Sequence, residues 1–478
     1  MAEASSPTST PRIAIIGGGI SGLTAAYRLT TLLPQAHIEL FEASERLGGV
    51  LYTRSDDDYL LELGADSFID KLPAAVELCR ELGLGDQIIP TNEEPRKALV
   101  LHGGKLHPVP EGFVQMRPEK LGPMLRTQLL SWRGKLRLLA ERWKRSPAEL
   151  ANEQFDESVA SFATRRLGRE VFERLVQPLL AGIYTADPYQ LSVAATMPTV
   201  FEAERQHGSL SRAALAAAQP GQGSGARYAS FVTPRGGLAT LIAALVDRLH
   251  QADVHFNAPI SAVTQHADQR WSISRVDGAE TQRFDGVIVA LPAPVAGRLL
   301  DATDSELSAE LAAIPYASSA VVALVYRRNQ INDPLDGFGI VVPTVEGRQI
   351  VAASFSSVKF PGRAPSDQVL IRVFVGGALQ PELLEKSDTE IKRLAQAELS
   401  DILSIVGVPL RSDLVRWKEK MPQYHVSHLQ RVERIEALTG LHAGLELAGN
   451  AYRGVGIPQC VQSGDSAARR LLETLART

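Results

Sequence analysis

Three glycines near the start of the chain have the spacing of a phosphate-binding turn. Gly17, Gly19 and Gly22 fit G-x-G-x-x-G between the apolar run RIAII and the helical spacing of ISGLTAAYRLTTLLP. In that pattern the first glycine allows the tight turn, the second admits a diphosphate, and the third lets helix and strand pack closely. Glu42, twenty residues beyond Gly22, would accept hydrogen bonds from ribose hydroxyls, which disfavours a 2′-phosphate. The residues predict a bound dinucleotide; the alternative is a glycine-rich loop without a ligand.

A second glycine-containing loop follows Glu42 directly, in the stretch ASERLGGVLYT. Arg46, Gly48 and Gly49 are expected to make a second close approach to the same ligand. A cofactor with a long ribityl arm can use two such loops, whereas a simple NAD site has less need of the second. This loop therefore favours FAD over NAD, and the alternative is an ordinary turn.

A third glycine turn lies near the end of the chain, in LELAGNAYRGVGIP. Gly454 and Gly456 follow a predicted buried strand, and Pro458 suits the first turn of a helix. The positive end of that helix would point at whatever occupies the turn. In a flavoprotein this arrangement suits the N1–C2=O side of the isoalloxazine, where reduced flavin carries negative charge. The alternative is a surface turn that only ends a strand.

Length and composition limit the class of protein. The chain has 478 residues, which suits two or three packed lobes, and its net charge of -4 gives no overall attraction to nucleic acid. Cys79 and Cys460 are its two cysteines, so a disulfide framework and a cysteine-based zinc site are not expected, and a reducing, cytoplasmic compartment is favoured. Residues 1–11 are expected to form a disordered tail rather than a secretory signal. No run approaches eighteen consecutive apolar residues, so a membrane-crossing helix is not expected.

The order of predicted elements suggests lobes that the chain enters more than once. A β-α-β opening is followed by helical, basic sequence from about Phe113, then by a glycine turn with a helix near residue 236. Residues 253–276 alternate apolar and polar residues like the strands of a meander, and residues from about 315 to 375 are mostly strand. The final strand, glycine turn and helix would then return to the opening domain. No internal repeat interrupts this pattern.

These features together resemble the oxygen-dependent porphyrinogen oxidases, over nearly the whole chain from Arg12 to about Ala476. The resemblance rests on IAIIGGGISGL, EASERLGG, ELGADSF, VQPLLAGIYTADPYQLS, RWKEKMPQYHVSH and GVGIPQC. The glycine motifs are shared with amine oxidases and phytoene desaturases, whereas LLAGIYTADPYQLS and MPQYHVSH are more specific to the porphyrinogen branch. The chain is most similar to the Gram-positive type that oxidises coproporphyrinogen III, and the relatives that oxidise protoporphyrinogen IX are the close alternative.

The resemblance implies an α/β (α+β) fold like that of the amine oxidases. A split Rossmann-like FAD-binding domain would be interwoven with a substrate domain of mixed sheet and with a helical lobe. The implied FAD-binding parts are residues 12–90, 226–300 and 416–478, the helical lobe is 91–225, and the substrate sheet is 301–415.

The same resemblance, together with the motifs, assigns residues to the cofactor. The predicted FAD contacts are Gly17, Gly18, Gly19, Ile20, Ser21, Gly22, Glu42, Ala43, Arg46, Gly49, Gly64, Ala65, Asp66, Ser67, Val263 on the adenine side, and Trp417, Val455, Gly456 and Ile457 near the flavin. Two positions depart from the relatives. Val50 stands where amine oxidases usually have arginine, and Asp66 stands where protoporphyrinogen oxidases often have arginine.

The implied reaction removes six hydrogens from the macrocycle in three rounds. Each round moves a hydride to the flavin and releases a proton from a pyrrole nitrogen, and O2 is reduced to hydrogen peroxide. No catalytic acid or base is assigned, because the cofactor carries the chemistry. Lys71 and Tyr184 are candidate substrate contacts, with surface charge and core aromatic as the alternatives. His425 and His428 are expected to have a structural rather than a metal-binding role, and no metal site is expected.

The basic stretch at residues 113–145 has several interpretations. It could rest on anionic lipid at the inner face of a membrane, receive a carboxylated substrate, dock the next enzyme of haem synthesis, or form a plain solvated face. Its members are Arg117, Lys120, Arg126, Arg133, Lys135, Arg137, Arg142, Lys144 and Arg145, with Trp132 and Trp143. Two other functions stay open at this point: a flavin amine oxidase, and a binding protein like the Rab GDP-dissociation inhibitors, which share the architecture without using flavin.

Overall fold

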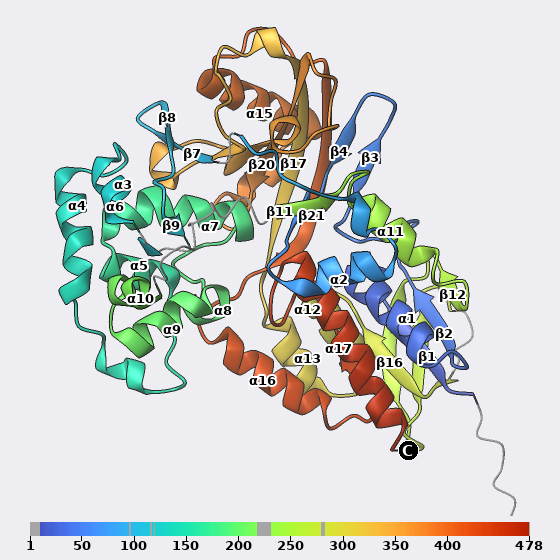
Figure 1. The fold of residues 1–478 in the computed structure, drawn as a ribbon. Coiled ribbons are helices and arrows are strands. Elements are labelled where there is room, and N and C mark those ends of the chain that lie inside the picture. The colour runs from blue at the N-terminus through green and yellow to red at the C-terminus, as the bar shows by residue number, and fades with distance from the viewer. Residues whose placement is uncertain are drawn as a thin grey trace, which may run out of the picture.

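The computed structural model describes residues 10–94, 97–114, 117–118, 120–217, 231–278 and 283–477. It places two large sheets and one group of helices around a common centre (Figure 1). Most of the predicted tail, and the predicted boundary at residues 225 and 226, lie outside the described residues. The boundaries of the predicted domains stay predictions.

A parallel five-stranded sheet forms the predicted cofactor domain. Its strands, in spatial order, are β12 (Ala252–His255), β2 (His37–Phe41), β1 (Arg12–Ile16), β16 (Gly286–Val289) and β22 (Leu445–Leu447). Near-continuous apolar sequence in the central strands fits burial on both faces. Three distant segments thus build one sheet, which agrees with the predicted split domain.

Helices cover both faces of this sheet. One face packs against α1 (Ile20–Leu32), α2 (Pro73–Glu81), α11 (Leu238–Val246) and α17 (Ile457–Leu475). The other face packs against α12 (Ala293–Leu300), α13 (Ser305–Ala312), α16 (His428–Thr439) and a small antiparallel sheet. The strands of that sheet are β13 (Ile260–Gln265), β14 (Trp271–Arg275) and β15 (Arg283–Phe284). The predicted meander therefore begins only at β13, because residues 252–255 pair in parallel with β2 instead.

A mixed seven-stranded sheet forms the second layer, as the fold class predicts. Its order is β21 (Arg411–Pro422), β17 (Tyr316–Arg327), β20 (Gln368–Gly376), β19 (Ala352–Phe355), β18 (Gly339–Val341), β7 (Ala98–His102) and β8 (Lys105–Pro108). All its neighbours are antiparallel except β18 and β7. Helix α15 (Asp388–Leu403) packs its apolar stripe on one face and α14 (Ser356–Lys359) lies beside β20. The other face looks toward the cofactor domain and the helical lobe.

Short strands connect the two layers. They are β3 (Thr53–Ser55), β4 (Leu60–Glu62), β5 (Phe68–Ile69), β6 (Ile88–Pro90) and β11 (Phe231–Pro234). Strand β4 is the one that leads into the ELGADSF motif. Leu61 and Leu63 pack against Ala323, Val325 and Leu370 of the mixed sheet, so this motif lies where the two layers meet.

The helical lobe follows β8 and has its own buried core. It contains α3 (Leu121–Arg126), α4 (Trp132–Leu139), α5 (Val159–Arg166), α6 (Arg169–Val171), α7 (Gln177–Tyr184), α8 (Val193–Thr196), α9 (Pro198–His207) and α10 (Leu210–Ala217). The basic stretch is less helical than predicted, because it begins with a hairpin of β9 (Phe113–Val114) and β10 (Arg117–Pro118). Pro118 and Pro123 each lack an N–H group and restrict the residue before them, which favours short elements here.

Candidate functional site

The first glycine turn joins β1 to α1 in the predicted geometry. Gly17 has a φ of 109°, a conformation that favours glycine, and its N–H donates to the carbonyl of Phe41 at 2.8 Å. Helix α1 has thirteen residues and begins after Gly19, with no side-chain cap on its N-terminus. Its first N–H groups and its positive end are therefore available to an anion.

The surroundings of Gly22 and Gly19 show which glycine is needed for close packing and which one borders open space for a ligand. A Cβ atom at Gly22 would overlap the carbonyl oxygen of Gly17, so this glycine is required by the chain itself. A Cβ atom at Gly19 would meet no protein atom within 4 Å, and the residue has an ordinary φ of -72°. The turn thus has open space beside Gly19, next to the uncapped helix end, and this space fits the diphosphate of a dinucleotide.

Glu42 lies at the end of β2 and binds the same turn. Its Oε2 accepts the N–H of Gly18 at 2.8 Å, and its Oε1 accepts the N–H and the hydroxyl of Ser44 at 2.8 and 2.7 Å. A carboxylate has about four acceptor positions, so room for one ribose hydroxyl remains. The structure therefore gives Glu42 a role in shaping the turn, in addition to its predicted contact with ribose.

The second glycine loop rests on the first. Gly48 donates its N–H to the carbonyl of Gly18 at 2.8 Å, and a Cβ atom at Gly49 would lie 3.2 Å from the Cα of Gly19. Arg46 donates to the carbonyl oxygens of Gly49 at 2.6 Å and Leu47 at 3.3 Å. The guanidinium thus holds the loop in place, and a direct contact of Arg46 with the ligand stays a prediction. Ala43 is exposed beside this loop.

The C-terminal turn joins β22 to α17 and is held by two side chains of the QYHVSH motif. The hydroxyl of Tyr424 donates to the carbonyl of Asn450 at 2.5 Å and accepts the N–H of Gly454 at 2.9 Å. His428 stacks on the Tyr424 ring with centroids 3.9 Å apart, and its Nε2 lies 2.9 Å from the carbonyl of Tyr452. Burial lowers the pKa of His428 to about 4, so the neutral ring donates this hydrogen bond.

No pattern in the sequence indicates this role of Tyr424 and His428. Their motif indicates a resemblance to a family, but it contains no signal for a contact with a turn that lies some 25 residues further along the chain. The predicted structural role of His428 agrees with its contacts. Among the residues that the structure describes, no three histidine, cysteine, aspartate or glutamate side chains are grouped as a metal site would require.

Helices α1 and α17 begin side by side, although they lie at opposite ends of the chain (Figure 1). The hydroxyl of Ser21 donates to the carbonyl of Cys460 at 2.9 Å, and a Cβ atom at Gly464 would overlap the carbonyl oxygen of Ser21. Helix α17 also begins without a side-chain cap, after Gly456. Two uncapped helix ends therefore face the same region. The third predicted loop residue, Ile457, is buried in the core that α1 and α17 share, and Val455 packs toward the helical lobe.

The loop of residues 64–67 completes this wall. A Cβ atom at Gly64 would overlap the carbonyl oxygen of Val50, and the indole of Trp417 donates to the carbonyl of Leu63 at 2.8 Å. Residues 64–67, which include Ala65, are all partly exposed in a region that is otherwise buried. The predicted cofactor residues Gly49, Gly64 and Trp417 are thus joined by direct packing, through Val50 and Leu63.

Asp66 is held by two cations that the sequence analysis did not identify. Its carboxylate lies 3.1 Å from the Nζ of Lys359 and 3.0 Å from the guanidinium of Arg372. Burial opposes ionisation, but these cations outweigh it and hold the pKa of Asp66 well below its usual range. Ser67 donates to Asp66 at 2.8 Å and accepts from Lys359 at 2.9 Å. Both cations lie about 300 residues away along the chain, so no local spacing could have indicated them.

One face of the mixed sheet continues the wall from Trp417. Register places Trp417 opposite Ser319 and Ser319 opposite Gly376, and residues 376, 374 and 372 of β20 alternate onto this same face. Helix α7 covers the far end of the face, because a Cβ atom at Gly182 would lie 3.6 Å from Val341 and 3.9 Å from Ala352. Trp417 and α7 thus border the two ends of one face of the mixed sheet.

The remaining candidates lie apart from this wall. Val263 is fully buried in β13 and its carbonyl accepts the Thr303 hydroxyl at 2.8 Å. Lys71 is exposed, whereas Tyr184 ends α7 with its hydroxyl 3.4 Å from the carbonyl of Thr196. Their predicted contacts with adenine or substrate stay predictions. Cys460 is buried and burial raises its pKa to about 12, which disfavours a covalent thiolate link to a flavin.

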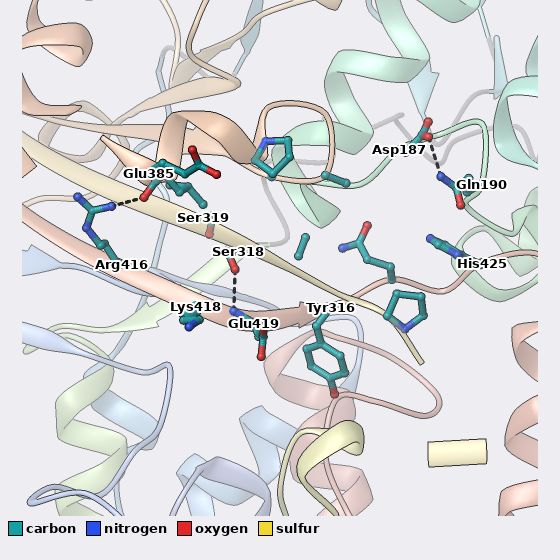
Figure 2. A pocket seen from close by; sticks show the side chains of 17 residues that line it. Asp187, Gln190, Tyr316, Ser318, Ser319, Glu385, Arg416, Lys418, Glu419 and His425 are labelled. Atoms are coloured by element: carbon teal, nitrogen blue, oxygen red, sulfur yellow. Dashed lines mark hydrogen bonds between the residues drawn. The ribbon is translucent and has the colours of Figure 1, made fainter. Parts of the chain in front are cut away.

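A separate cavity of about 540 Å³ opens on the other face of β17 and β21. Figure 2 shows Arg416 and Lys418 there, which alternate with Trp417 along β21 and so point away from the wall described above. Asp187, Glu385 and Glu419 line it as well, so its charges are mixed. Its polar groups do not converge on a ligand, and no site residue predicted from the sequence lines it.

Comparison with known proteins agrees with this geometry. Residues 20–472 match the family described as flavin containing amine oxidoreductase. Coproporphyrinogen III oxidase of Bacillus subtilis is 33% identical over 465 residues, which is 95% of this chain and 96% of that protein. Protoporphyrinogen oxidase of Bos taurus is 32% identical over 97% of this chain and 98% of that protein.

Solved structures show the same architecture. A protein from Exiguobacterium sp. 255-15, provisionally named a protoporphyrinogen oxidase, matches with a TM-score of 0.86 and 30% identity over 97% of this chain and 99% of that chain. Cyclohexylamine oxidase from Brevibacterium oxydans shares the fold, with a TM-score of 0.69 at 17% identity over 98% of this chain and 100% of that chain. The chain belongs to the flavin containing amine oxidoreductase family and, within it, to the coproporphyrinogen III and protoporphyrinogen oxidases. The predicted family, fold class and FAD cofactor are thereby confirmed.

Proposed function

We propose that the protein oxidises coproporphyrinogen III to coproporphyrin III, with FAD as its cofactor and O2 as the electron acceptor. The observation that carries this proposal is full-length similarity at 33% identity to a coproporphyrinogen III oxidase. Further relatives of that name, from Staphylococcus aureus and Propionibacterium freudenreichii, are 30% and 31% identical over 98% and 96% of this chain. The close alternative is protoporphyrinogen IX, because Bos taurus protoporphyrinogen oxidase is similar to the same extent.

The proposed reaction balances as three two-electron oxidations. Six hydrogens leave the macrocycle and three O2 molecules become three hydrogen peroxide molecules. FAD, when bound, would supply the hydride acceptor and the route for electrons to O2. The protein contributes the binding geometry: N–H groups at the start of α1 hold the diphosphate, and the turn before α17 directs a positive helix end at the ring.

The substrate would lie on the face of the mixed sheet between Trp417 and α7. Phe374 lies on this face in register with Ala352 and Val341, which gives an apolar surface for a macrocycle. Tyr184 at the end of α7 is a candidate for packing on the substrate, and Lys71 is a candidate for a propionate. Both assignments rest on their positions in the motifs.

The test is porphyrin fluorescence under air, with kcat/KM compared for the two porphyrinogens and peroxide measured per porphyrin formed. We expect three peroxide molecules per porphyrin and a preference of at least tenfold for coproporphyrinogen III. A preference for protoporphyrinogen IX would select the alternative substrate, and equal rates without oxygen would contradict the proposed acceptor. If a yellow protein oxidises neither, amines are the next substrates to try. A colourless protein that binds no FAD would favour the binding-protein alternative.

A second proposal concerns the edge of the helical lobe. We propose that α4 and the turn after it bring the cytoplasmic protein onto an anionic membrane surface. Trp132, Leu136 and Trp143 are 66%, 56% and 75% exposed, which is unusual for such large apolar side chains. Exposed Arg133, Arg142, Lys144 and Arg145 surround them, and indole rings flanked by cations are typical of surfaces that enter lipid headgroups. The described part of the chain holds no helix both long and apolar enough to span a bilayer.

Vesicle sedimentation tests this contact. Full-length protein should bind vesicles that contain phosphatidylglycerol, bind neutral phosphatidylcholine vesicles weakly, and release at high salt. The Trp132→Ala, Trp143→Ala double variant should lose the binding. Val406 and Val408 are 67% and 75% exposed outside this lobe, so their double alanine variant is the control. Equal binding by both double variants would contradict the proposal, and specific retention by a purified ferrochelatase-type partner would favour protein docking instead.

A further inference from the structure

An unbalanced group of charged side chains, largely shielded from water, meets at the 64–67 loop, which borders the predicted flavin position. Lys359, Arg363 and Arg372 are the cations, and Asp66 and Glu62 are the carboxylates, so the group has one more cation than carboxylates. Arg363 and Arg372 are each 2% exposed. Because unpaired charge is costly to bury, a surplus cation in such a place calls for an electrostatic role or a negative partner.

Glu62 does little to neutralise this surplus. Glu62 ends β4, and its side chain reaches the start of α11, where its carboxylate accepts the N–H of Leu238 at 2.7 Å and the hydroxyl of Thr53 at 2.8 Å. Burial raises its pKa to about 7, so the carboxyl is only partly ionised at neutral pH. With Glu62 only partly ionised, Asp66 is the main negative charge opposite Lys359, Arg363 and Arg372. Burial lowers the pKa of Lys359, and the neighbouring carboxylate of Asp66 favours its charged form.

The donors of both cations are directed at the 64–67 loop. Lys359 donates to both carboxylate oxygens of Asp66 at 3.1 and 3.2 Å and to the Ser67 hydroxyl at 2.9 Å. Arg372 donates to the carbonyl of Gly64 and pairs with Asp66. These donors are occupied, whereas the Nε of Arg372 has no hydrogen-bond partner among the described residues. The charge of the two side chains can act through space on a neighbouring group, since the surroundings are largely shielded from water.

The neighbouring group is the predicted flavin ring, whose position is given by the loops and the sheet face described above. Gly64 packs on Val50, and a Cβ atom added at Gly64 would lie 3.5 Å from the Trp417 ring. Arg372 lies on the sheet face that also carries Trp417. On the other side, Phe68 belongs to the same buried core as Ile457, where α17 begins. The charged group thus sits between the two elements assigned to the flavin ring.

We propose that Lys359 and Arg372, partly neutralised by Asp66, act as positioning residues that place net positive charge beside the flavin ring and make the bound flavin easier to reduce. This inference rests on the proposed FAD site but not on the identity of the substrate. Reduced flavin is negatively charged, so a nearby cation held in a low-dielectric region stabilises it relative to the oxidised form. The carboxylate of Asp66 offsets part of that positive charge.

The experiment measures two properties of the purified FAD-loaded protein: the midpoint potential against a reference dye, and the dissociation constant of sulfite, which adds to flavin as an anion. Lys359→Met keeps an apolar stem against the rings of Phe231 and Phe360 and removes the charge. We expect its sulfite dissociation constant to rise roughly tenfold and its potential to fall, by about 30 mV for each tenfold change in the reduction equilibrium. Asp66→Asn should change both quantities in the opposite direction.

Opposite signs separate this role from simple support of the loop. If the group only braces the loop, both variants would weaken FAD binding and neither would shift the potential in a charge-dependent way. Lys359→Arg keeps the charge and should restore the potential. Lys418→Met makes the same charge change on the opposite face of the sheet, at an exposed residue, and should change nothing.

Two results would overturn the proposal. One is an unchanged potential and sulfite affinity in Lys359→Met; the other is a fall in potential in Asp66→Asn. If Lys359→Met fails to hold FAD, Asp66→Asn decides alone, and no rise in its potential counts against the proposal. Neither measurement uses a porphyrinogen, so failure of the proposed substrate would leave this result intact.

Discussion

Removing one hydroxyl group from Tyr424 tests whether the C-terminal turn holds the cofactor. In Tyr424→Phe the ring still stacks on His428, and the donor to Asn450 and the acceptor for Gly454 are lost together. Each hydrogen bond contributes about 0.5–1.5 kcal/mol, and leaving a partner unsatisfied costs about 1–3 kcal/mol. The expected total is about 2 kcal/mol. If the bound cofactor requires the ordered turn, FAD affinity should fall by roughly 30-fold.

The assay titrates apoprotein with FAD and follows quenching of the flavin fluorescence, with thermal unfolding of the apoprotein measured alongside. Tyr326→Phe is the matched control. Tyr326 is fully buried, burial raises its pKa to about 12, and its hydroxyl has no hydrogen-bond partner among the described residues. The control should therefore bind FAD normally and unfold at the same or a higher temperature.

Two outcomes would refute this reasoning. If Tyr424→Phe binds FAD within twofold of Tyr326→Phe, the turn does not need its tyrosine. If the variant unfolds earlier but keeps its affinity, the hydroxyl stabilises the fold, and the turn is not coupled to the cofactor.

Three further predictions follow from particular contacts. Gly19→Ala should leave the unfolding free energy of the apoprotein unchanged but weaken FAD binding, whereas Gly22→Ala should destabilise the apoprotein itself. Calorimetry with and without FAD separates the two effects. Equal behaviour of both variants would contradict the different packing of the two glycines. Burial lowers the pKa of His428 to about 4 in the folded protein, against an ordinary 6.5, so the unfolded chain binds more protons between these two values. The free energy of unfolding should therefore fall as the pH drops, by about 2 kcal/mol between about pH 7.5 and about pH 5. Urea unfolding of wild type and His428→Gln at both pH values measures this loss, which should be absent from the variant. Changing Glu204, which is fully buried against Arg166, to glutamine should cost about 3 kcal/mol, because Arg165 and Arg166 lose a carboxylate that they share and Arg166 keeps only Glu141 as an acidic neighbour; a change below about 1 kcal/mol in urea unfolding would show that the pair is dispensable.

Local sequence signals predicted the parts of the site that are local. The spacing of Gly17, Gly19 and Gly22 gave the turn, its place between β1 and α1, and the acid at the end of β2, because each depends on backbone geometry within a single β-α-β unit. Likewise, the turn before α17 was visible from Gly454, Gly456 and Pro458.

Other features depend on pairings that no local pattern contains. Residues 252–255 alternate like an edge strand of a meander, but β2 offers them a parallel partner, and tertiary pairing decides between the two. Pro118 and Pro123 break the basic stretch into short elements despite its helical spacing. Lys359 and Arg372 reach Asp66 from about 300 residues away, in a short helix and a strand whose own sequence shows no sign of a charged site.

The position of a glycine turn at the very end of the chain has a structural reason. Helix α17 completes the site only when it packs along α1, and that contact is so close that Gly464 must meet the backbone of Ser21 without a side chain between them. Neither helix caps its own N-terminus, so both leave polar N–H groups directed at one region. An anionic, hydrogen-bonding ligand such as the proposed FAD would satisfy both ends at once and so link the first and last segments of the chain. The same arrangement leaves the intervening residues free to build the mixed sheet and the helical lobe.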